Sequence, residues 1–202
     1  MSKTDIEIIG LDFETSTGNT ANLAPIQIGM CTSALGPFFD TKIGGWDWGP
    51  ESETLWSAGS ENVHKITQEE LGKAPGIFEV DVRAAVWVLD EFGHANRMNR
   101  VAVGWNVGSF DRAIVQKWMP NLNKVLSYRT IDLNTVCFYA ADVLDMPYGQ
   151  LKDQVKKEAA QNLGGGSWHN AIFDAQAGVL TYHSMVALMK DKAGTVLEKA
   201  TK

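Results

Sequence analysis

Cysteine is scarce in this 202-residue chain, and its two cysteines, Cys31 and Cys137, form no CxxC pair. This excludes a disulfide framework and predicts two reduced thiols in the core of a cytoplasmic protein. The chain has no apolar run of the roughly 18 residues that a transmembrane helix requires. It also has no internal repeat, no low-complexity segment and no basic-then-apolar signal at its start. We therefore expect no membrane partner.

An excess of positive charge is missing as well, since the formal net charge is −6 at pH 7. This balance disfavours a protein that coats DNA or binds an anionic membrane surface. It does not exclude a nucleic-acid enzyme whose carboxylates are masked by metal ions. The length favours one domain with a substantial core, and the apolar fraction of 45% is that of an ordinary globular protein.

The hydrophobic pattern predicts a layered α/β domain with a mixed sheet. Strands are expected at residues 6–13, 25–32, 37–42 and 101–104, and the first three would form an antiparallel meander. Helices are expected at residues 77–92, 109–118, 132–143, 149–163 and about 171–190. Thr67 followed by Glu70 is a capping box that predicts another helix start. The Gly- and Trp-rich residues 43–62 look irregular.

Two carboxylates, Asp12 and Glu14, close the first predicted strand in the stretch IIGLDFETST. Side chains two residues apart on a strand share a face, and their Cα atoms lie about 6.5–7 Å apart. Repulsion between them would be relieved by Mg²⁺ or Mn²⁺, which prefer oxygen ligands. From this pair alone, a cation site and a strand end that frays into solvent are equally compatible with the sequence.

Three further polar residues occupy informative positions. Asp111 follows the strand at residues 101–104, near a helix start, where a carboxylate also serves as a cap. Asp174 falls among apolar or small neighbours within the last helix, so its carboxylate needs a partner. His169 lies five residues earlier, behind the glycines at 164–166, which suits either a mobile general base or an exposed loop histidine. The remaining histidines are interpreted as surface residues: His64, His94 and His183.

The segments LDFETS, NVGSFD and HNAIFD resemble, in this order, the three motifs of the DnaQ-like (DEDDh) 3′→5′ exonucleases. The resemblance covers nearly the whole chain and implies an RNase H-like fold over residues 1–190, followed by a short polar tail at 191–202. It implies that four acidic residues hold the metal ions: Asp12, Glu14, Asp111 and Asp174. His169 matches the general base of this family. Asn170 stands where the related DEDDy group has tyrosine.

The mechanism that this resemblance implies uses two divalent ions, Mg²⁺ or Mn²⁺, at the terminal phosphodiester of a single-stranded DNA or RNA 3′ end. Asp12 would bridge both ions, with Glu14 and Asp174 at one of them. Asp111 would hold the other through water, and His169 would take a proton from the attacking water. The product would be a nucleoside 5′-monophosphate. The expected substrate contacts are Phe13, Thr15, Trp105 and Asn106.

The chain departs from the family pattern in two places. Trp105 stands where proofreading members usually have histidine, and Thr15-Ser16-Thr17-Gly18 replaces Thr-Thr-Gly. VHKITQEELGKAP resembles proofreading members, whereas NVGSFDRAIVQKWMPNL and YRTIDLNTV resemble oligoribonucleases. The sequence therefore assigns no subfamily, and both a monomer and a homodimer stay open.

Two groups of residues have alternative interpretations. Three tryptophans lie in the irregular segment: Trp46, Trp48 and Trp56. One or more of them would stack on a substrate base. The alternative, which we favour, is that they cover the core edge or a dimer interface. Three lysines would touch phosphates or, more simply, form a solvated helix face: Lys152, Lys156 and Lys157. Two alternative functions also remain for the whole chain. They are a catalytically inactive module that binds nucleic acid or a polymerase, and a metal-dependent hydrolase of small nucleotides.

Overall fold

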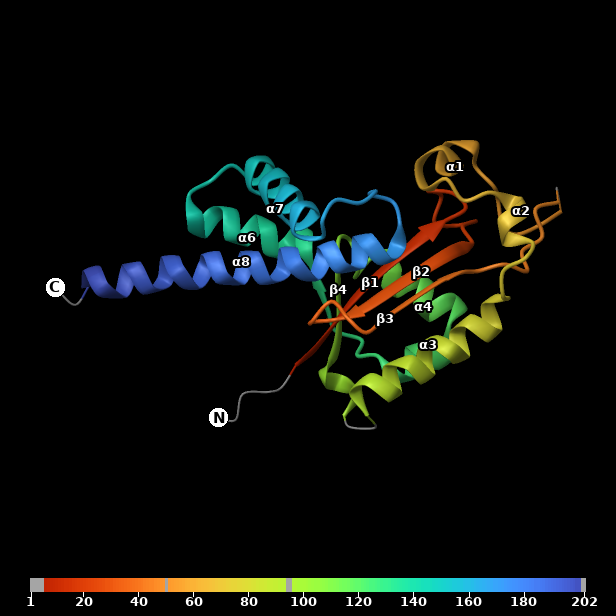
Figure 1. Ribbon diagram of the computed structural model, residues 1–202, viewed down its shortest axis with the longest axis horizontal. Coiled ribbons are helices and arrows are strands. Elements are labelled where there is room, and N and C mark those ends of the chain that lie inside the picture. Colours follow the sequence, from red (N-terminus) through yellow and green to blue (C-terminus); the bar gives the residue numbers. More distant parts are fainter. Residues whose placement is uncertain (1–5, 50, 94–95, 201–202) are drawn as a thin grey trace.

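The computed structural model describes residues 6–49, 51–93 and 96–200. Within these residues the strands are β1 (Glu7–Thr15), β2 (Pro25–Thr32), β3 (Phe38–Lys42), β4 (Arg100–Gly104) and β5 (Thr130–Asp132). They form one sheet in the order β3-β2-β1-β4-β5 (Figure 1). The pairings β1–β2 and β2–β3 are antiparallel, whereas β1–β4 and β4–β5 are parallel. The predicted meander and mixed sheet are confirmed.

Helices cover both faces of this sheet (Figure 1). They are α1 (Ala58–His64), α2 (Gln68–Leu71), α3 (Ile77–Phe92), α4 (Asp111–Trp118), α5 (Pro120–Val125), α6 (Leu133–Leu144), α7 (Tyr148–Asn162) and α8 (Ala171–Ala200). α8 packs across β1 and β2, with α6 and α7 beside it. α3 and α4 pack against the opposite face.

β1 divides its side chains between the two layers. Ile9 and Leu11 belong to the cluster that contains α3 and α4, whereas Ile8 belongs to the cluster formed with α6, α7 and α8. Because side chains alternate along a strand, Asp12 and Glu14 lie on the same face as Ile8, toward α8. The prediction that both carboxylates share one face is confirmed.

The start of α8 lies unusually close to the sheet because glycines face it. A Cβ atom at Gly29 of β2 would overlap the backbone of Ala171, and one at Gly10 of β1 would come within 2.6 Å of the Ala175 carbonyl oxygen. The Ala171 N–H also donates to Gln27 Oε1 at 3.4 Å. These contacts fix the first turn of α8 over the end of β1, where the predicted site lies.

Several predicted boundaries are wrong. α8 continues to Ala200, so its predicted end near Lys190 is wrong, and the predicted polar tail at 191–202 includes its last turns. Residues 201–202 lie outside the described part of the chain. The stretch after Lys190 contains Ala, Lys, Leu and Glu, which are good helix formers and allow the helix to continue. α1 and the three-residue strand β5 were not predicted, because such short elements carry little periodicity.

The tryptophans of segment 43–62 cover the edge of the core, which confirms the core-edge interpretation. Trp46 donates from Nε1 to the Pro25 carbonyl at 3.0 Å and packs edge-on against Trp118, with ring centroids 5.0 Å apart. Trp48 and Trp56 pack together at 5.1 Å over a small core cluster. The predicted capping box at the start of α2 is also present.

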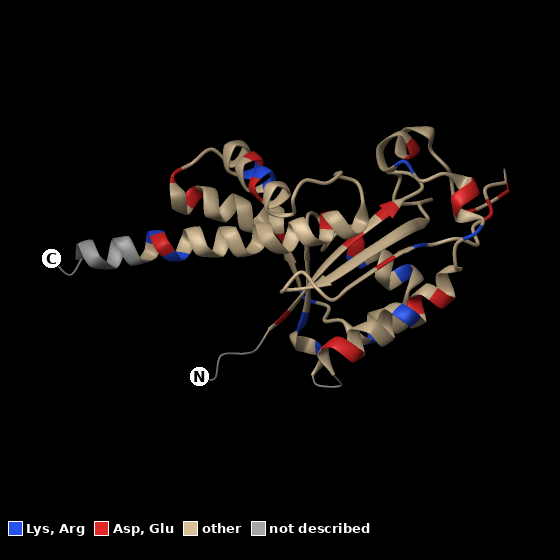
Figure 2. Ribbon diagram, viewed as in Figure 1, with Lys and Arg blue, Asp and Glu red and all other residues tan. Residues whose placement is uncertain are grey.

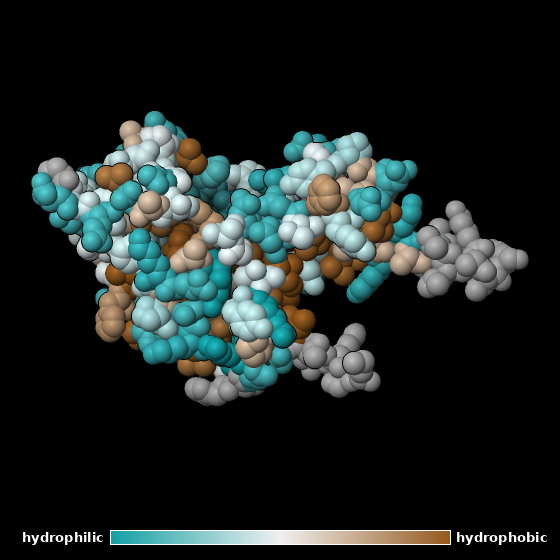
Figure 3. Space-filling model, turned by 180° about the vertical axis from the view of Figure 1, so that it is seen from behind, coloured by the Kyte–Doolittle hydropathy of each residue, from teal (hydrophilic) through white to brown (hydrophobic). Residues whose placement is uncertain are grey.

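The surface of the described residues is mainly polar. Figure 3 shows the molecule from behind, with hydrophobic side chains in patches among hydrophilic ones. Three exposed apolar residues follow one another along α3: Phe78, Val82 and Val86. Exposed apolar residues are normal on a monomer, so both a monomer and a homodimer stay open. Cys31 and Cys137 are buried free thiols. Across the described residues, every helix is too short or too polar to span a bilayer.

Candidate active site

The predicted acidic residues converge near the C-terminal end of β1. Asp12 and Glu14 lie on β1, Asp111 is the first residue of α4, and Asp174 lies in the first turn of α8. Figure 2 shows acidic positions at the end of β1 and the start of α8, with basic positions on the nearby α7. A cavity of about 340 Å³ is lined by Asp12, Glu14, Asp174 and His169, among others.

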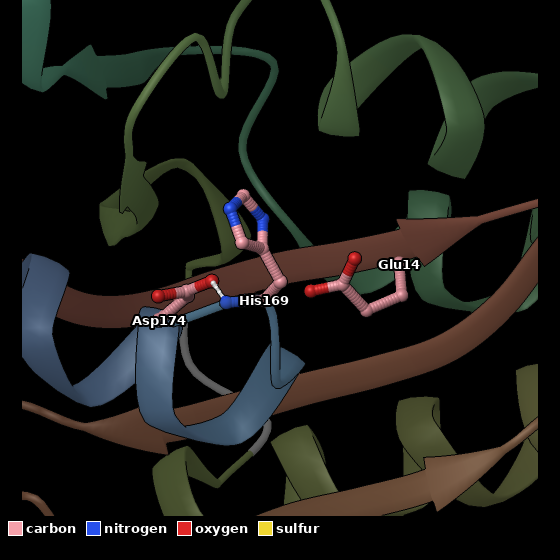
Figure 4. A group of neighbouring side chains, drawn as sticks. All are labelled: Glu14, His169 and Asp174. Atoms are coloured by element: carbon pink, nitrogen blue, oxygen red, sulfur yellow. Dashed lines mark hydrogen bonds between the residues drawn. The ribbon is translucent and has the colours of Figure 1, made fainter. Parts of the chain in front are cut away.

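Glu14, His169 and Asp174 form the tightest group in this cavity. One potential ligand atom from each lies within 4.8 Å of those of the other two. The His169 backbone N–H donates to Asp174 Oδ2 at 2.8 Å, as Figure 4 shows. In Figure 4 the imidazole projects from the loop at a point between the two carboxylates. The structure therefore brings together side chains from β1 and from the loop that leads into α8.

Asp111 is buried behind this group, with 2% of its surface exposed. Its Oδ1 accepts the backbone N–H of Phe13 at 3.0 Å, so this carboxylate links the start of α4 to β1 between Asp12 and Glu14. The residue before α4 is Phe110, which makes no side-chain cap. Asp111 contributes negative charge to the site, and its role as a metal ligand stays a prediction.

All four carboxyl groups have raised pKa values, and burial is the main cause. The pKa of Glu14 is raised to about 8 by burial and then by Asp174 and Asp111. The pKa of Asp174 is raised to about 6 by burial, although its bond to the His169 N–H opposes the rise. Burial and neighbouring carboxylates also raise the pKa of Asp12 and Asp111. Without bound cations, the site is short of positive charge.

The donor set fits hard divalent cations. Asp174 Oδ1 is buried and accepts no hydrogen bond from the described residues. The carboxylates of Asp12 and Glu14 are held beside it in low-dielectric surroundings, where an unpaired anion is costly. Carboxylate oxygens are the ligands that Mg²⁺ and Mn²⁺ prefer. Which of these ions binds, and whether two bind, stays a prediction.

The loop that carries His169 has an unusual backbone. Gly164 and Gly165 have φ values of 77° and 84°, and His169 itself has φ of 68°, in the left-handed region that residues other than glycine rarely adopt. A Cβ atom at Gly166 would overlap the ring of Phe173. Such local strain often occurs at functional sites. The loop therefore holds an exposed histidine beside two acidic side chains.

The four predicted substrate contacts all line the cavity: Phe13, Thr15, Trp105 and Asn106. Phe13 and Thr15 are buried, Trp105 is half-buried and Asn106 is exposed. Asn106 has φ of 59°, and its Oδ1 accepts a hydrogen bond from Asn134 at 2.7 Å. Their contact with a substrate stays a prediction.

The interpretation of the α7 lysines as a solvated face is wrong for two of the three. The Lys156 ammonium lies 4.2 Å from the ring centroid of Trp168 and 5.6 Å from that of Trp105. The Lys152 ammonium lies 4.9 Å from the Trp105 ring. Of the three, only Lys157 is exposed, and the other two are half-buried. Charge spacing on α7 could not reveal this arrangement, because the aromatic partners come from other segments.

His64 is another departure, because it is buried and not on the surface as predicted. Its ring packs edge-on against Trp56 at 6.0 Å, and its Nε2 is buried without a hydrogen-bond partner among the described residues. A second cavity of about 340 Å³ lies beside it and is also lined by Glu14. His183 is exposed, as predicted, and His94 lies outside the described residues.

No protein-family model matches this chain, and neither does any curated protein. The structure does resemble solved exonucleases. One is a 3′-exonuclease described in the 3′-end-specific recognition of a histone mRNA stem-loop. It has a TM-score of 0.60 at 16% identity, over 92% of this chain and 84% of that one. Cell-death related nuclease 4 gives a TM-score of 0.61 at 14% identity, over 91% and 64% of the two chains.

Escherichia coli exonuclease I, solved in complex with a 5cy-dT13 oligonucleotide, gives a TM-score of 0.62 at 15% identity. The match covers 96% of this chain and 42% of the exonuclease I chain, so this chain spans less than half of that protein's length. At such low identities, the structural similarity identifies the fold alone. The chain has the RNase H-like fold of the 3′-exonucleases, with a mixed sheet flanked by helices, as the sequence predicted.

Proposed function

We propose that this protein is a metal-dependent 3′→5′ exonuclease of the DEDDh class, which removes nucleoside 5′-monophosphates from single-stranded nucleic acid. The observation that carries this proposal is the convergence of buried and half-buried carboxylates with His169 at the end of β1. The shared fold of solved 3′-exonucleases supports it independently of the sequence motifs.

The four carboxylates are the proposed ligands of two divalent ions, Mg²⁺ or Mn²⁺: Asp12, Glu14, Asp111 and Asp174. Bound there, the ions would neutralise charge on the phosphodiester and lower the pKa of the attacking water. The raised pKa values support this assignment, because they indicate a site whose anions need nearby positive charge. The unpartnered Asp174 Oδ1 supports it in the same way.

His169 is the proposed general base. Its imidazole shares the cavity with Glu14 and Asp174, and its loop position leaves it accessible to water. In the proposed reaction the imidazole accepts a proton from water while the water oxygen bonds to phosphorus. The bond from phosphorus to the 3′ oxygen breaks, and that oxygen takes a proton and remains on the shortened strand. The released nucleotide carries the phosphate on its 5′ oxygen.

The substrate end would lie against the aromatic and polar residues of the cavity, which are Phe13, Thr15, Trp105 and Asn106. Aromatic rings hold unstacked bases with little sequence preference, which suits a single-stranded end. Two of the solved E. coli exonuclease I structures contain the oligonucleotides dA16 and 5cy-dT13, which supports a similar substrate here.

A catalytically inactive binding module explains the site less well. Such a module gains nothing from buried carboxylates, each of which costs several kcal/mol when it is unpaired. Glu14, at 8% exposed, lies among like charges from Asp174 and Asp111, and this repulsion would destabilise a protein that never binds a cation. The acidic cluster therefore favours an enzyme.

The test is cleavage of single-stranded DNA and RNA oligomers labelled at the 5′ end, with Mg²⁺, Mn²⁺ or EDTA. Asp12→Asn removes the charge with little change in shape, and the matched control is Asp90→Asn on the exposed side of α3. We expect a ladder of products shortened from the 3′ end for wild type and control, and none with EDTA or Asp12→Asn. Undiminished cleavage by Asp12→Asn, or no cleavage by folded wild type, would contradict the proposal.

A further inference from the structure

An open groove adjoins the carboxylate cavity. It runs between α7 and the glycine loop and has a volume of about 850 Å³. Lys156 and Trp168 line both the groove and the carboxylate cavity, so the two hollows meet at this pair. A chain that enters the cavity can therefore continue into the groove past Lys156 and Trp168.

The lining of the groove is suited to an anionic, planar ligand. Lys156 and Lys157 contribute positive charge, and Asp153 contributes one negative charge. The half-buried indole of Trp168 provides an aromatic surface at the point where the groove meets the cavity. This positive lining in an otherwise acidic protein, with a net charge of −6, is locally complementary to a polyanion.

The two half-buried lysines of α7 differ in how their ammonium groups are used. Lys152 donates to Asn134 Oδ1 at 3.0 Å, and Tyr148 donates to the same oxygen at 2.9 Å, so Lys152 is held in place beside Trp105. Lys156 contacts two indole rings but forms no hydrogen bond or ion pair with the described residues. Its N–H donors are therefore available to an anionic ligand.

Lys156 is also close to the carboxylates, since it lines the same cavity as Asp12 and Asp174. A phosphate bound by Lys156 would thus lie next to the phosphodiester that is cleaved. Single strands are commonly held by this combination of a cation for the backbone and an aromatic ring for the base.

We propose that Lys156 and Trp168 form the upstream subsite for a single-stranded polynucleotide. Lys156 binds a backbone phosphate on the 5′ side of the scissile bond, Trp168 stacks the adjacent base, and the groove holds further nucleotides along α7. This inference rests on the proposed function and deepens it. The substrate is a strand of several nucleotides, not a free nucleotide or a dinucleotide.

The first test compares a 5′-hydroxyl dinucleotide with an octamer as substrates. The dinucleotide has no phosphate upstream of the scissile bond, whereas the octamer fills the groove. We expect wild type to prefer the octamer in kcat/KM. Lys156→Gln should raise KM for the octamer about tenfold, equivalent to one good contact. The fall in kcat/KM that Lys156→Gln causes should be larger for the octamer than for the dinucleotide. Lys156→Arg, which keeps the positive charge, should recover most of the affinity.

The matched control is Lys124→Gln, which removes an exposed lysine from α5, near the other end of β4. This control should behave as wild type with both substrates. Lys156→Gln should also reduce the salt dependence of octamer binding, with the slope of log K against log salt falling by about 0.7 for the lost phosphate contact. An unchanged KM and salt slope in Lys156→Gln would overturn the subsite.

Binding to a hydrolysis-deficient variant separates this inference from the proposed function. We would measure the fluorescence anisotropy of a labelled octamer with Asp12→Asn, alone and combined with Lys156→Gln or Trp168→Ala. Weaker binding in both combined variants supports the subsite even if wild type cleaves no strand, in which case only the proposed function fails. Equal binding in all three proteins, or no octamer binding at all, overturns the subsite.

Discussion

At the scale of single residues, the acidic side chains at the end of β1 oppose their own ionisation. Glu14 is 8% exposed and shares its surroundings with Asp174 and Asp111, so its pKa is raised from 4.5 to about 8. In the unfolded chain this carboxyl group has its ordinary pKa and releases its proton near pH 4–5. The folded and unfolded states therefore bind different numbers of protons over most of the physiological range.

This difference predicts how the metal-free protein responds to pH. Between about pH 4.5 and 8 the folded state keeps the Glu14 proton that the unfolded state releases, so this group lowers the stability as the pH rises toward 8. Glu14→Gln should therefore raise the Tm in EDTA at pH 8, by about 2–4 °C for each kcal/mol gained in the free energy of unfolding. It should change the Tm little at pH 5. Thermal unfolding from pH 5 to 8 checks this.

The control for this prediction is Glu79→Gln on α3, because Glu79 is exposed and its ion pair with Arg83 lies on the surface. Its Tm should differ from that of wild type by the same small amount at each pH. A Glu14→Gln protein that is less stable than wild type at pH 8 in EDTA would contradict the account of the acidic cluster.

His169 gives a second prediction at this scale. If its imidazole takes the proton from water, His169→Ala should lower kcat by about 10²–10⁴-fold while divalent-ion binding is largely kept. Single-turnover rates and metal titrations measure the two effects separately. His183→Ala, which removes an exposed histidine on α8, is the control and should keep the wild-type rate. A kcat of His169→Ala within about threefold of wild type would exclude this role.

At the scale of elements, the position of α8 on the sheet places Asp174 and the His169 loop beside β1. The close approach depends on Gly29, where a Cβ atom would overlap the Ala171 backbone. Gly29→Ala should lower the free energy of unfolding by about 1–3 kcal/mol or more, as overpacking does, and should also reduce activity by displacing Asp174. Urea denaturation and the exonuclease assay measure the two effects.

Gly149→Ala is the control for this substitution. Gly149 lies on α7, where a Cβ atom would meet nothing within 4 Å. It should be neutral or slightly stabilising, because alanine favours a helix over glycine. Equal stability of the two variants would show that the contact between α8 and β2 is looser than described.

The long periodic elements could be predicted from sequence, and the short or context-dependent ones could not. β2 and α3 were predicted at their observed bounds, and β1 and α7 to within two residues, because each presents a regular apolar face over eight residues or more. β5 has three residues and α1 has seven, which is too few for a reliable period.

The candidate site shows the same division between local and tertiary information. Period-two alternation placed Asp12 and Glu14 on one face of β1, which the structure confirms. The contact of Lys156 with Trp168 and the burial of His64 could not be predicted, because each depends on side chains brought together by tertiary packing. Local spacing identifies the residues of a helix face but not what packs against it.

At the scale of the whole molecule, the proposed metal site would link folding to metal binding. A ligand that binds only the folded state stabilises it by RT ln(1 + [L]/Kd), about 2.7 kcal/mol at a concentration of 100 Kd. Mn²⁺ at that concentration should therefore raise the Tm of wild type by about 5–10 °C. The rise should grow between pH 6 and 8, because metal ligands must be deprotonated. Thermal unfolding with and without Mn²⁺ tests this.

The change in Tm with Mn²⁺ should also be measured for Asp12→Asn and for the exposed control Asp90→Asn. The rise in Tm with Mn²⁺ should shrink strongly in Asp12→Asn and persist in Asp90→Asn. An equal rise in all three proteins would mean that the ion binds elsewhere on the acidic surface, and the assignment of the carboxylates as its ligands would be wrong.

The most direct test of the account is the chemistry of the product. We would incubate the wild-type protein with an unlabelled single-stranded oligomer and Mn²⁺ in water enriched in ¹⁸O, and identify the products by mass spectrometry. The proposed hydrolysis should give nucleoside 5′-monophosphates with one ¹⁸O in the phosphate, and strands that keep a 3′ hydroxyl as they shorten. Products with a 3′-phosphate, or an oligomer that remains intact with folded protein and metal present, would contradict it.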